Sequence, residues 1–327
     1  MGTWLLSADL LARSRFVVSP LTETVAALTI LSDPQPPGTP WQRAFHAQHH
    51  EAYAEMLAED GARRSLVQRL WRRRRGSVPG WMADFICLPP LGPDATFEDE
   101  LGQLRSWDAG RIRAELASLT GRALPPELER ADVRAVVAEV LRWVWTATIA
   151  SDWPRRRRVL EADIVSRTSR LAAEGWAGVF DTLGSRQRWV GGGQLQINGY
   201  DLPTRDLTAA KELSFVPVHS GGHWVAWDLP DRFAVVYPVA GALAEIEGGT
   251  PDGLSRLIGQ NRARVLMLLD QPRSTTQLAA LTDLPLGAVG NHLRVLLESG
   301  TVLRRRTGRE VLYWRTSLGD ELVAVGG

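Results

Sequence analysis

The chain has 327 residues and a formal net charge of +1, with 44% hydrophobic and 23% charged residues. This composition is typical of a globular protein of two or three domains and excludes a largely disordered chain. No apolar run approaches the roughly 18 residues of a membrane span, and the first residues lack the pattern of a secretion signal, so we expect a cytoplasmic protein.

Residues 44–174 show mostly helical periodicity. The clearest case is "ADVRAVVAEVLRWVWTATIA", where apolar residues recur at spacings of three and four and fall on one helix face. A further helix is expected to begin at Ser151 or Asp152, with Pro154 in its first turn, and to stop at Gly175. Shorter helices are predicted at residues 44–59, 63–74 and 97–119.

After about residue 185 the chain changes to short segments rich in Val and aromatic residues, separated by Gly, Pro and Asp. The segments "RQRWVGGGQLQINGY", "KELSFVPVHS", "GHWVAWDLP" and "RFAVVYPVA" predict a small antiparallel sheet. The best linker is "EIEGGTPDG", which is poor in apolar residues. We therefore expect an α+β protein: a mainly helical N-terminal domain with this sheet at 1–245, a linker at 246–253 and a C-terminal domain at 254–327.

The C-terminal segment is the basic end of the chain. Residues 253–327 hold ten arginines against six acidic residues, whereas residues 1–252 hold 28 basic and 31 acidic residues. A leading helix is predicted at 254–269. Ser274 to Gln277 have the S-x-x-Q form of a capping box that opens a short helix, and a turn at 283–285 leads to a second helix closed by Gly300. Two short helices joined by a tight turn are the unit that places its second helix in a major groove.

A basic hairpin follows directly. "LRRRTGREVLYW", residues 303–314, holds four arginines around a turn at Thr307-Gly308. The order of helices, turn and arginine-tipped hairpin is that of a winged helix-turn-helix domain, whose wing lies against the phosphate backbone or minor groove. Guanidinium groups suit that role because they fork to phosphate oxygens and stay charged. A merely solvated hairpin is the alternative.

Residues 254–322 resemble the ArsR/SmtB-type winged-helix repressors. The resemblance rests on R-A-x-x-L in the leading helix and then on S-T-T-x-L-A, x-x-H-L-x-x-L and R-x-G-R-x-x-x-Y. It implies binding of operator DNA through the second helix of the pair, the recognition helix. Family members usually carry small hydroxyl residues early in that helix, where this chain has Ala288 and Gly290. Two hydrogen bonds with DNA that the resemblance would imply are therefore absent.

The first 245 residues resemble a domain of unknown function that is often fused ahead of such winged helices. The segments that carry this resemblance are "RFVVSPLTETVAALTILSDP", "LEADIVSR" and "VVYPVAG". It implies an architecture and no activity.

On the recognition helix, we expect Leu286, Gly287, Asn291 and Arg294 to face the groove. Asn can pair with adenine and Arg with guanine or phosphate, each good pair being worth ~1 to 3 kcal/mol of discrimination. A plain surface arginine is an equal alternative for Arg294. For His292, beside an apolar position, packing or capping is favoured over base reading.

Phosphate contacts are predicted at the start of the preceding helix from Thr275, Thr276 and Gln277, which also fit simple capping. In the wing, strand side chains alternate, so the four arginines cannot all face one way. We expect contacts with DNA from Arg306, Arg309 and either Arg304 or Arg305.

Metal binding is not expected. Several relatives bind thiophilic metals through cysteines on the helix occupied here by "TTQLAALTD", and others use His and Asp on a final helix; this chain has neither set. Its only cysteine, Cys87, excludes an internal disulfide and a site of several thiolates from one chain. His46 and His50 have a spacing that can chelate, and His219 and His223 flank two glycines, but surface histidines and a loop are simpler interpretations. No cofactor is expected either.

Tryptophan is unusually frequent, and 12 of the 13 lie before residue 253. Trp covers a large apolar area and keeps one N–H donor, so a cluster can line a pocket for a flat or hydrophobic ligand. Core filling is the alternative for most of them. The arginine runs "WRRRRG" and "WPRRRR" are typical of solvated faces, with an extended DNA footprint or an anion site as the alternative.

The sequence thus predicts a transcriptional repressor that binds double-stranded operator DNA as a homodimer, while its N-terminal domain binds a small organic effector. We expect the pairing contacts from the N-terminal domain or the leading helix. Two alternatives stay open: the winged helix docks a protein partner, or the N-terminal part is an enzyme. The nearest paired carboxylates, Glu161 and Asp163, diverge on a helix, so we expect no catalysis.

Overall fold

The computed structural model describes residues 2–34, 39–72, 80–183, 187–220, 222–239, 252–270, 272–307 and 310–325. The chain divides into two compact units, Met1–Trp153 with Phe180–Pro238, and Pro154–Val179 with Val239–Gly327. The α+β class is confirmed, with a C-terminal helix-turn-helix region. The expected linker at 246–253 lies almost wholly outside the described residues and stays a prediction. Among the described helices, none has both the length and the apolar character that a bilayer span requires.

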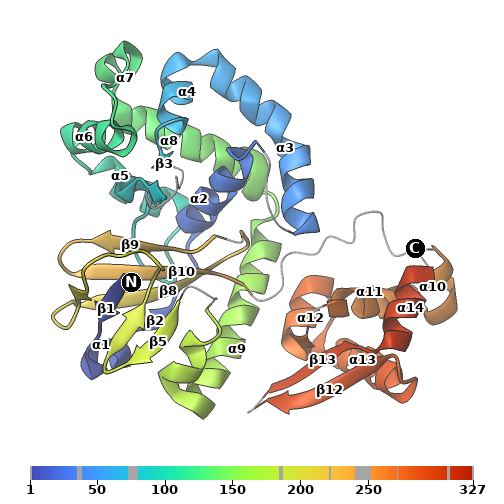
Figure 1. Cartoon of the computed structure of the whole chain (residues 1–327). Helices are drawn as coiled ribbons and strands as arrows, with labels where there is room; N and C mark the ends of the chain where they lie inside the picture. Colours follow the sequence, from blue (N-terminus) through green and yellow to red (C-terminus); the bar gives the residue numbers. More distant parts are fainter. Residues whose placement is uncertain are drawn as a thin grey trace. The chain divides into compact units, whose positions relative to one another are not determined.

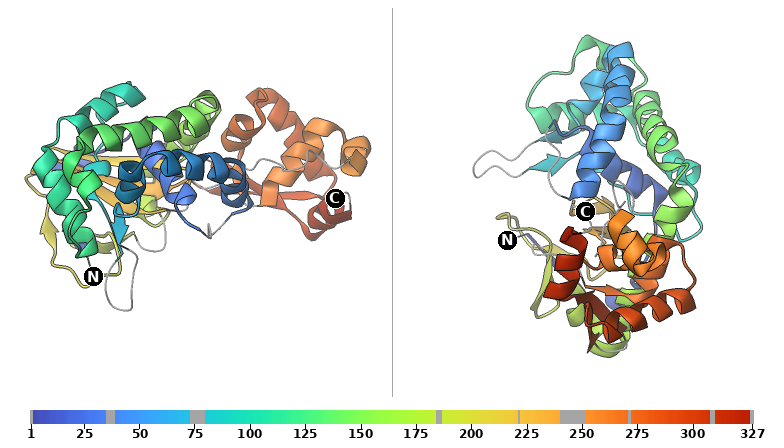
Figure 2. Two further views of the ribbon diagram at one scale, coloured as in Figure 1. Left: turned by 90° about the horizontal axis from the view of Figure 1, so that it is seen from above. Right: turned by 90° about the vertical axis from the view of Figure 1, so that its right-hand side faces the viewer.

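Helices form the larger layer of the first unit. Helices α2 to α8 gather on one side of the strands in Figure 1, and the left view of Figure 2 shows them lying over the strands. The helices of this unit are α1 (Ala8–Arg13), α2 (Pro20–Leu31), α3 (Pro40–Glu59), α4 (Gly61–Val67), η1 (Asp84–Ile86), α5 (Phe97–Arg105), α6 (Ala109–Thr120), α7 (Pro126–Arg130), α8 (Val133–Val144) and the π-helical turn η2 (Trp145–Ile149).

The strands of the first unit form two four-stranded sheets, ordered β5-β6-β1-β7 and β2-β8-β10-β9, and a short β3-β4 hairpin. Their bounds are β1 (Thr3–Leu5), β2 (Arg15–Phe16), β3 (Trp71–Arg72), β4 (Trp81–Met82), β5 (Arg188–Gly191), β6 (Gln194–Gln196), β7 (Arg205–Asp206), β8 (Glu212–Val218), β9 (Trp224–Asp228) and β10 (Arg232–Pro238).

The expectation of one small antiparallel sheet was wrong in part: β5 with β6 and β9 with β10 are antiparallel as expected, but the strands form two sheets and both contain parallel pairs. Strand β8 runs parallel to both β2 and β10, and β1 runs parallel to β7. Strands β8 and β10 are buried along nearly their whole length. Continuous burial on both faces is typical of strands in parallel sheets, whereas alternation is typical of antiparallel ones.

Two of the expected helices also end early. The helix expected at 63–74 stops at Val67, and residues Trp71–Arg72 form β3 instead. The helix expected at 97–119 is divided into α5 and α6, because the Asp108 side chain accepts the Arg111 N–H at 2.8 Å and caps a new helix start.

Helix α2 is the centre of the first unit. It packs against α3, α5, α8 and β8, and 11 of its 12 residues are buried. The Glu100 side chain satisfies its first turn: Oε2 accepts hydrogen bonds from Ser19 Oγ at 2.8 Å and Leu21 N at 2.9 Å. The Glu23 carboxylate lies 3.0 Å from His219 Nδ1 and accepts the His219 backbone N–H at 3.1 Å. His219 thus lies in the bend after β8, as expected, but it is buried and linked to α2.

The second unit contains helix α9 and the winged helix. Its helices are α9 (Trp153–Phe180), α10 (Asp252–Ile258), α11 (Gln260–Met267), η3 (Leu268–Asp270), α12 (Thr275–Thr282), α13 (Leu286–Glu298) and α14 (Ser317–Val325). Strands β11 (Arg273–Ser274), β12 (Val302–Thr307) and β13 (Glu310–Arg315) form one sheet in the order β11-β13-β12. In Figure 1 the β12-β13 hairpin extends away from α12 and α13 as the wing.

The local signals of the helix-turn-helix are confirmed. Ser274 Oγ accepts the Gln277 N–H at 3.3 Å, and Gln277 Oε1 accepts the Ser274 N–H at 2.8 Å, which closes the capping box. Asp283 ends α12 in the left-handed conformation, and Gly300 follows α13 with φ +70°. The leading helix differs from expectation, because Gly259 at φ +85° and ψ 141° divides it into α10 and α11.

We predict that Glu100 makes the first unit less stable as the pH rises. Burial raises the pKa of Glu100 to about 7, although hydrogen bonds from Leu21 and Ser19 lower it. A carboxyl whose pKa is higher in the folded than in the unfolded state destabilises the fold as it ionises, between its ordinary pKa and about 7. From pH 5 to pH 8, wild type should lose about 2 kcal/mol of unfolding free energy that Glu100→Gln retains, measured by urea unfolding.

Glu98→Gln is the matched control on the same helix. Hydrogen bonds from Arg142 lower the pKa of the exposed Glu98, so it does not titrate in this range. The assignment fails if Glu100→Gln and wild type show parallel pH profiles.

We further predict opposite effects for two glycines of the winged helix. Gly259→Ala should weaken it by about 1–3 kcal/mol, because the backbone conformation at Gly259 is open almost only to glycine. Gly290→Ala should strengthen it by about 0.5–1 kcal/mol, because Gly290 is helical and has nothing within 4 Å of an added Cβ. Hydrogen exchange of peptides from α11 and α13 in the full chain measures both changes; two effects of the same sign would contradict the prediction.

Candidate nucleic-acid interface and ligand pocket

Helix α13 presents an exposed stripe opposite its core face. Its buried side chains are those of Val289, Leu293 and Leu296, which share one face at helical spacing. The exposed residues on the opposite face are Gly287, Gly290, Asn291, Arg294 and Glu298. Leu286, at the helix start, is 55% exposed. All four residues predicted on this helix are therefore exposed, and three of them share the stripe.

Two side chains of the stripe contact each other. Arg294 Nη2 donates a hydrogen bond to Asn291 Oδ1 at 3.2 Å. The two glycines of the stripe, Gly287 and Gly290, leave bare backbone with nothing within 4 Å of an added Cβ. The bare backbone at the two glycines lets a partner molecule approach the helix closely there. Next to them along the stripe, Asn291 and Arg294 have side chains that can form hydrogen bonds with such a partner. His292 is half-buried, and burial and the nearby Arg262 lower its pKa, which supports the packing interpretation.

The start of α12 needs one correction. Thr275 and Thr276 are half-buried and keep part of their side chains at the surface. Gln277 is only 8% exposed, and its Oε1 is held by the capping box. The Gln277 side chain therefore caps the helix, as in the capping alternative, and is not part of the exposed surface at this helix start.

The strand register decides which wing arginines lie together. Arg304 is opposite Tyr313, Arg305 opposite Leu312 and Arg306 opposite Val311. Because side chains alternate along a strand, Arg304 and Arg306 share one face and Arg305 lies on the other. All three are exposed. Arg309 lies outside the described residues, so its predicted contact stays a prediction.

Other arginines of the second unit support its backbone. Arg264 donates to the carbonyl oxygens of Leu281 at 3.2 Å and Thr282 at 3.1 Å, at the end of α12. Arg315 donates to the Met267 carbonyl oxygen at 3.2 Å and pairs with Asp320 at 2.7 Å. These side chains act as structural supports, which distinguishes them from the exposed arginines of α13 and the wing.

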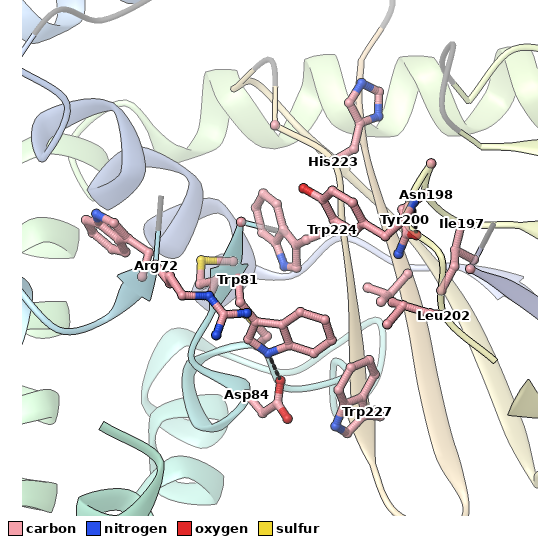
Figure 3. A pocket seen from close by; sticks show the side chains of 18 of the residues that line it. Arg72, Trp81, Asp84, Ile197, Asn198, Tyr200, Leu202, His223, Trp224 and Trp227 are labelled. Carbon is pink, nitrogen blue, oxygen red and sulfur yellow. Dashed lines mark hydrogen bonds between the residues drawn. The ribbon is translucent and has the colours of Figure 1, made fainter. Parts of the chain in front are cut away.

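The first unit contains a pocket of about 1040 Å³. Its walls come from the end of α2, the β3-β4 hairpin with η1, the segment between β6 and β7, and β9. Figure 3 shows Trp81, Trp224, Trp227 and Tyr200 around the same space. Together with Trp4 and Trp71, five of the 13 tryptophans line it. Concave, largely aromatic spaces with a few polar groups are typical binding sites for small molecules.

Asp84 organises one wall of this pocket. Trp81 Nε1 donates to Asp84 Oδ1 at 3.3 Å, the dashed line in Figure 3. Burial raises the pKa of Asp84, while hydrogen bonds from the Trp81 and Trp227 indoles and the nearby Arg205 guanidinium lower it. The Glu115 carboxylate in turn accepts the Asp84 backbone N–H, and burial raises the pKa of Glu115 to about 7. Asp84 therefore fixes the orientation of two tryptophan rings.

The sequence indicated this pocket only through its excess of tryptophan. Asp84, Asn198, Tyr200 and Arg205 line it but belong to no motif, and they come from segments far apart in the chain. Asn198 shapes one of these segments, because its Oδ1 accepts the Tyr200 N–H at 3.0 Å. Arg72, from the first arginine run, also lines the pocket.

The paired histidines of α3 and the paired carboxylates of α9 contact neighbours on their own helix or next to it. The His46 and His50 rings stack with centroids 4.2 Å apart, and His50 Nδ1 lies 3.1 Å from the Leu31 carbonyl oxygen. Within the described ranges, no three His, Cys, Asp or Glu side chains converge where they could hold a metal ion. The two carboxylates weighed for catalysis are ion-paired on α9, Glu161 with Arg157 at 2.8 Å and Asp163 with Arg167 at 2.7 Å.

Comparison with known proteins bears on the second unit alone. The search of curated proteins gives no match for the chain. Residues 260–305 match the family model of a helix-turn-helix domain. The matched segment runs from α11 through the recognition helix α13 into the first wing strand. The chain therefore carries a helix-turn-helix domain of the kind that DNA-binding regulators use.

Proposed function

We propose that the chain is a cytoplasmic transcriptional repressor of the ArsR/SmtB type, which binds operator DNA as a homodimer and releases it when a small organic ligand occupies the aromatic pocket. The observation that carries the DNA-binding part is the exposed stripe of α13 followed by an arginine-rich wing. In this proposal the first unit binds the ligand and catalyses no reaction.

Charge supports the choice of DNA as the partner. The net positive charge of residues 253–327 is concentrated in the wing, and exposed arginines at such a position neutralise phosphates. Asn291 and Arg294 offer the amide and guanidinium groups that read adenine and guanine edges. Contacts with phosphate position a protein on the duplex, and contacts with bases specify the sequence.

Geometry supports the homodimer. One recognition helix reads one half-site, and a two-fold pair reads two half-sites about one helical turn apart. The winged-helix part exposes apolar side chains that pairing would cover: Leu257 on α10 is 68% exposed and Leu318 on α14 is 46% exposed. Burial of such side chains on association is favourable.

A protein-docking winged helix is the second candidate, because the recognition stripe includes two glycines and Leu286 and Leu303 are 55% and 50% exposed. The two candidates differ in salt dependence and sequence preference. DNA binding by phosphate neutralisation weakens steeply with log salt, whereas docking on an apolar surface does not.

We predict that single substitutions Arg304→Ala, Arg305→Ala and Arg306→Ala will identify the DNA-facing side of the wing. Substituting an arginine that contacts phosphate should lower the slope of log affinity against log salt by about one. Arg304 and Arg306 should behave alike and differ from Arg305, since they lie on opposite faces. Arg256→Ala is the control, because it removes the same single positive charge from an exposed arginine of α10, outside the wing.

Fluorescence anisotropy with a duplex of mixed sequence measures the slope. Selection of bound sequences from a random duplex library measures specificity, and it should enrich a palindrome whose preference relaxes at one position in Asn291→Ala. A flat salt response together with no enriched sequence would rule out DNA as the partner and favour protein docking.

We predict that ligands of the pocket reduce affinity for the selected duplex. A panel of small aromatic compounds is titrated while Trp fluorescence and DNA release are followed together. Trp227→Leu should raise the ligand concentration needed for release about tenfold, because it removes an aromatic wall and the partner of Asp84. Trp107→Leu, a half-buried tryptophan outside the pocket, should leave it unchanged. Binding without any loss of DNA affinity would contradict ligand-controlled release.

A further inference from the structure

One polar group in the wall of the pocket lacks a partner. Arg205, the first residue of β7, lines the pocket, and its Nη1 is buried without a hydrogen-bond partner among the described residues. A buried donor on a permanently charged group is costly to leave unsatisfied, so native structures rarely retain one without a function. The missing partner must be an acceptor, because a guanidinium group has none of its own.

The rest of the Arg205 side chain is held in place. Its Cζ lies 4.6 Å from the centroid of the Trp227 ring. Its backbone is paired with Trp4 of β1 in a parallel bridge. A donor that is already oriented loses little conformational entropy on binding, so it favours a ligand with an acceptor at this position.

The acids that line the pocket are already engaged. Asp84 accepts a hydrogen bond from the Trp81 indole. Burial raises the pKa of Asp84, while the Trp81 and Trp227 indoles and the Arg205 guanidinium lower it. Asp33 interacts with His46. A second guanidinium adds to the positive charge: Arg72 on β3 is paired with Trp81 on β4 and extends toward it in Figure 3. Arg205 thus offers a ligand a charged donor that no described residue satisfies.

The aromatic walls offer ring faces and not donors. The Trp81 and Trp227 rings lie 6.1 Å apart at an angle of 53°. The Trp81 indole N–H donates to Asp84 at 3.3 Å, and the Trp227 indole contributes to lowering the pKa of the same carboxyl. Planar apolar groups gain most from such faces, through area burial and offset or edge-to-face packing.

We propose that the pocket takes a planar aromatic carboxylate, with its rings against Trp81, Trp224 and Trp227 and its carboxylate on the Arg205 guanidinium. A carboxylate is the planar acceptor that matches the fork of a guanidinium group. The effect of such a ligand on DNA affinity rests on the proposed function. Its binding to the pocket does not, and it is measured without DNA.

The test is isothermal titration calorimetry on the full chain with three probes of one shape: 2-naphthoate, the neutral 2-naphthamide and the cationic 2-naphthylmethylammonium. Wild type should bind the carboxylate at least about tenfold more tightly than the amide, and the ammonium probe most weakly. Arg205→Gln should abolish the preference for the carboxylate while its affinity for the amide stays within about twofold. Arg205→Lys, which keeps the charge, should restore part of the preference.

Arg105→Gln, an exposed arginine at the end of α5 outside the pocket lining, is the matched control and should keep the full preference. Retained binding of the amide by Arg205→Gln shows that its pocket is folded, and thermal unfolding gives an independent check. Equal binding of carboxylate and amide, a preference for the ammonium probe, no binding of any probe at millimolar concentration, or an unchanged preference in Arg205→Gln would overturn the inference. If the carboxylate binds as expected and DNA affinity does not change, the inference stands and the proposed function fails.

Discussion

The winged helix depends on the amphipathic character of α13. With a repeat of 3.6 residues per turn, this helix must bury one face in the core and expose the opposite face to the surface. Val289, Leu293 and Leu296 are each almost fully buried. Burial of one such side chain is worth about 1.5–3 kcal/mol, so rotating the helix about its axis would cost several times that amount. The core therefore determines the direction of the opposite stripe. Asn291 lies two positions from Val289 and Leu293, and Arg294 lies two positions from Leu296, which is about half a turn around the helix. When the apolar side chains point inward, these two therefore point outward.

The features that could be predicted from the sequence are those fixed by local hydrogen bonds. The capping box of Ser274 and Gln277, the kink of α9 at Gly175, where φ is 70° and ψ is −173°, and the close of α13 at Gly300 each depend on a few neighbouring residues. The break at Gly259 was missed because an apolar stripe on both sides is equally consistent with one continuous helix. The parallel pairing of β8 with β10 was missed because short segments separated by turns do not specify their order in a sheet.

The two candidate sites differ in the same way. Residues of the proposed DNA-facing surface lie within one segment of about 30 residues, where helical and strand periodicity place each side chain. The pocket is assembled from the end of α2, the β3-β4 hairpin, the segment before β7, and β9, so its composition depends on tertiary structure. The excess of tryptophan indicated that such a space exists. It did not indicate Asp84, which orients two of the rings, or Arg205, because neither has a spacing or a neighbour that distinguishes it from a surface residue.

In the proposed function, the ligand occupies a pocket that is built from distant segments of the chain. A ligand changes DNA affinity only by the difference between its affinities for the DNA-binding and the DNA-free conformations. Reversing such an equilibrium from 99:1 to 1:99 needs about 5.5 kcal/mol of that difference. In this proposal, a wall that keeps one shape in both conformations, such as Asp84 with the Trp81 indole that it binds, contributes little to that difference, because it binds the ligand equally in both. In the proposed function, that difference must arise where the ligand joins segments from distant parts of the chain, such as the β3-β4 hairpin and the loop that contains Asn198 and Tyr200. An effector that only filled the rigid wall would bind tightly and regulate nothing.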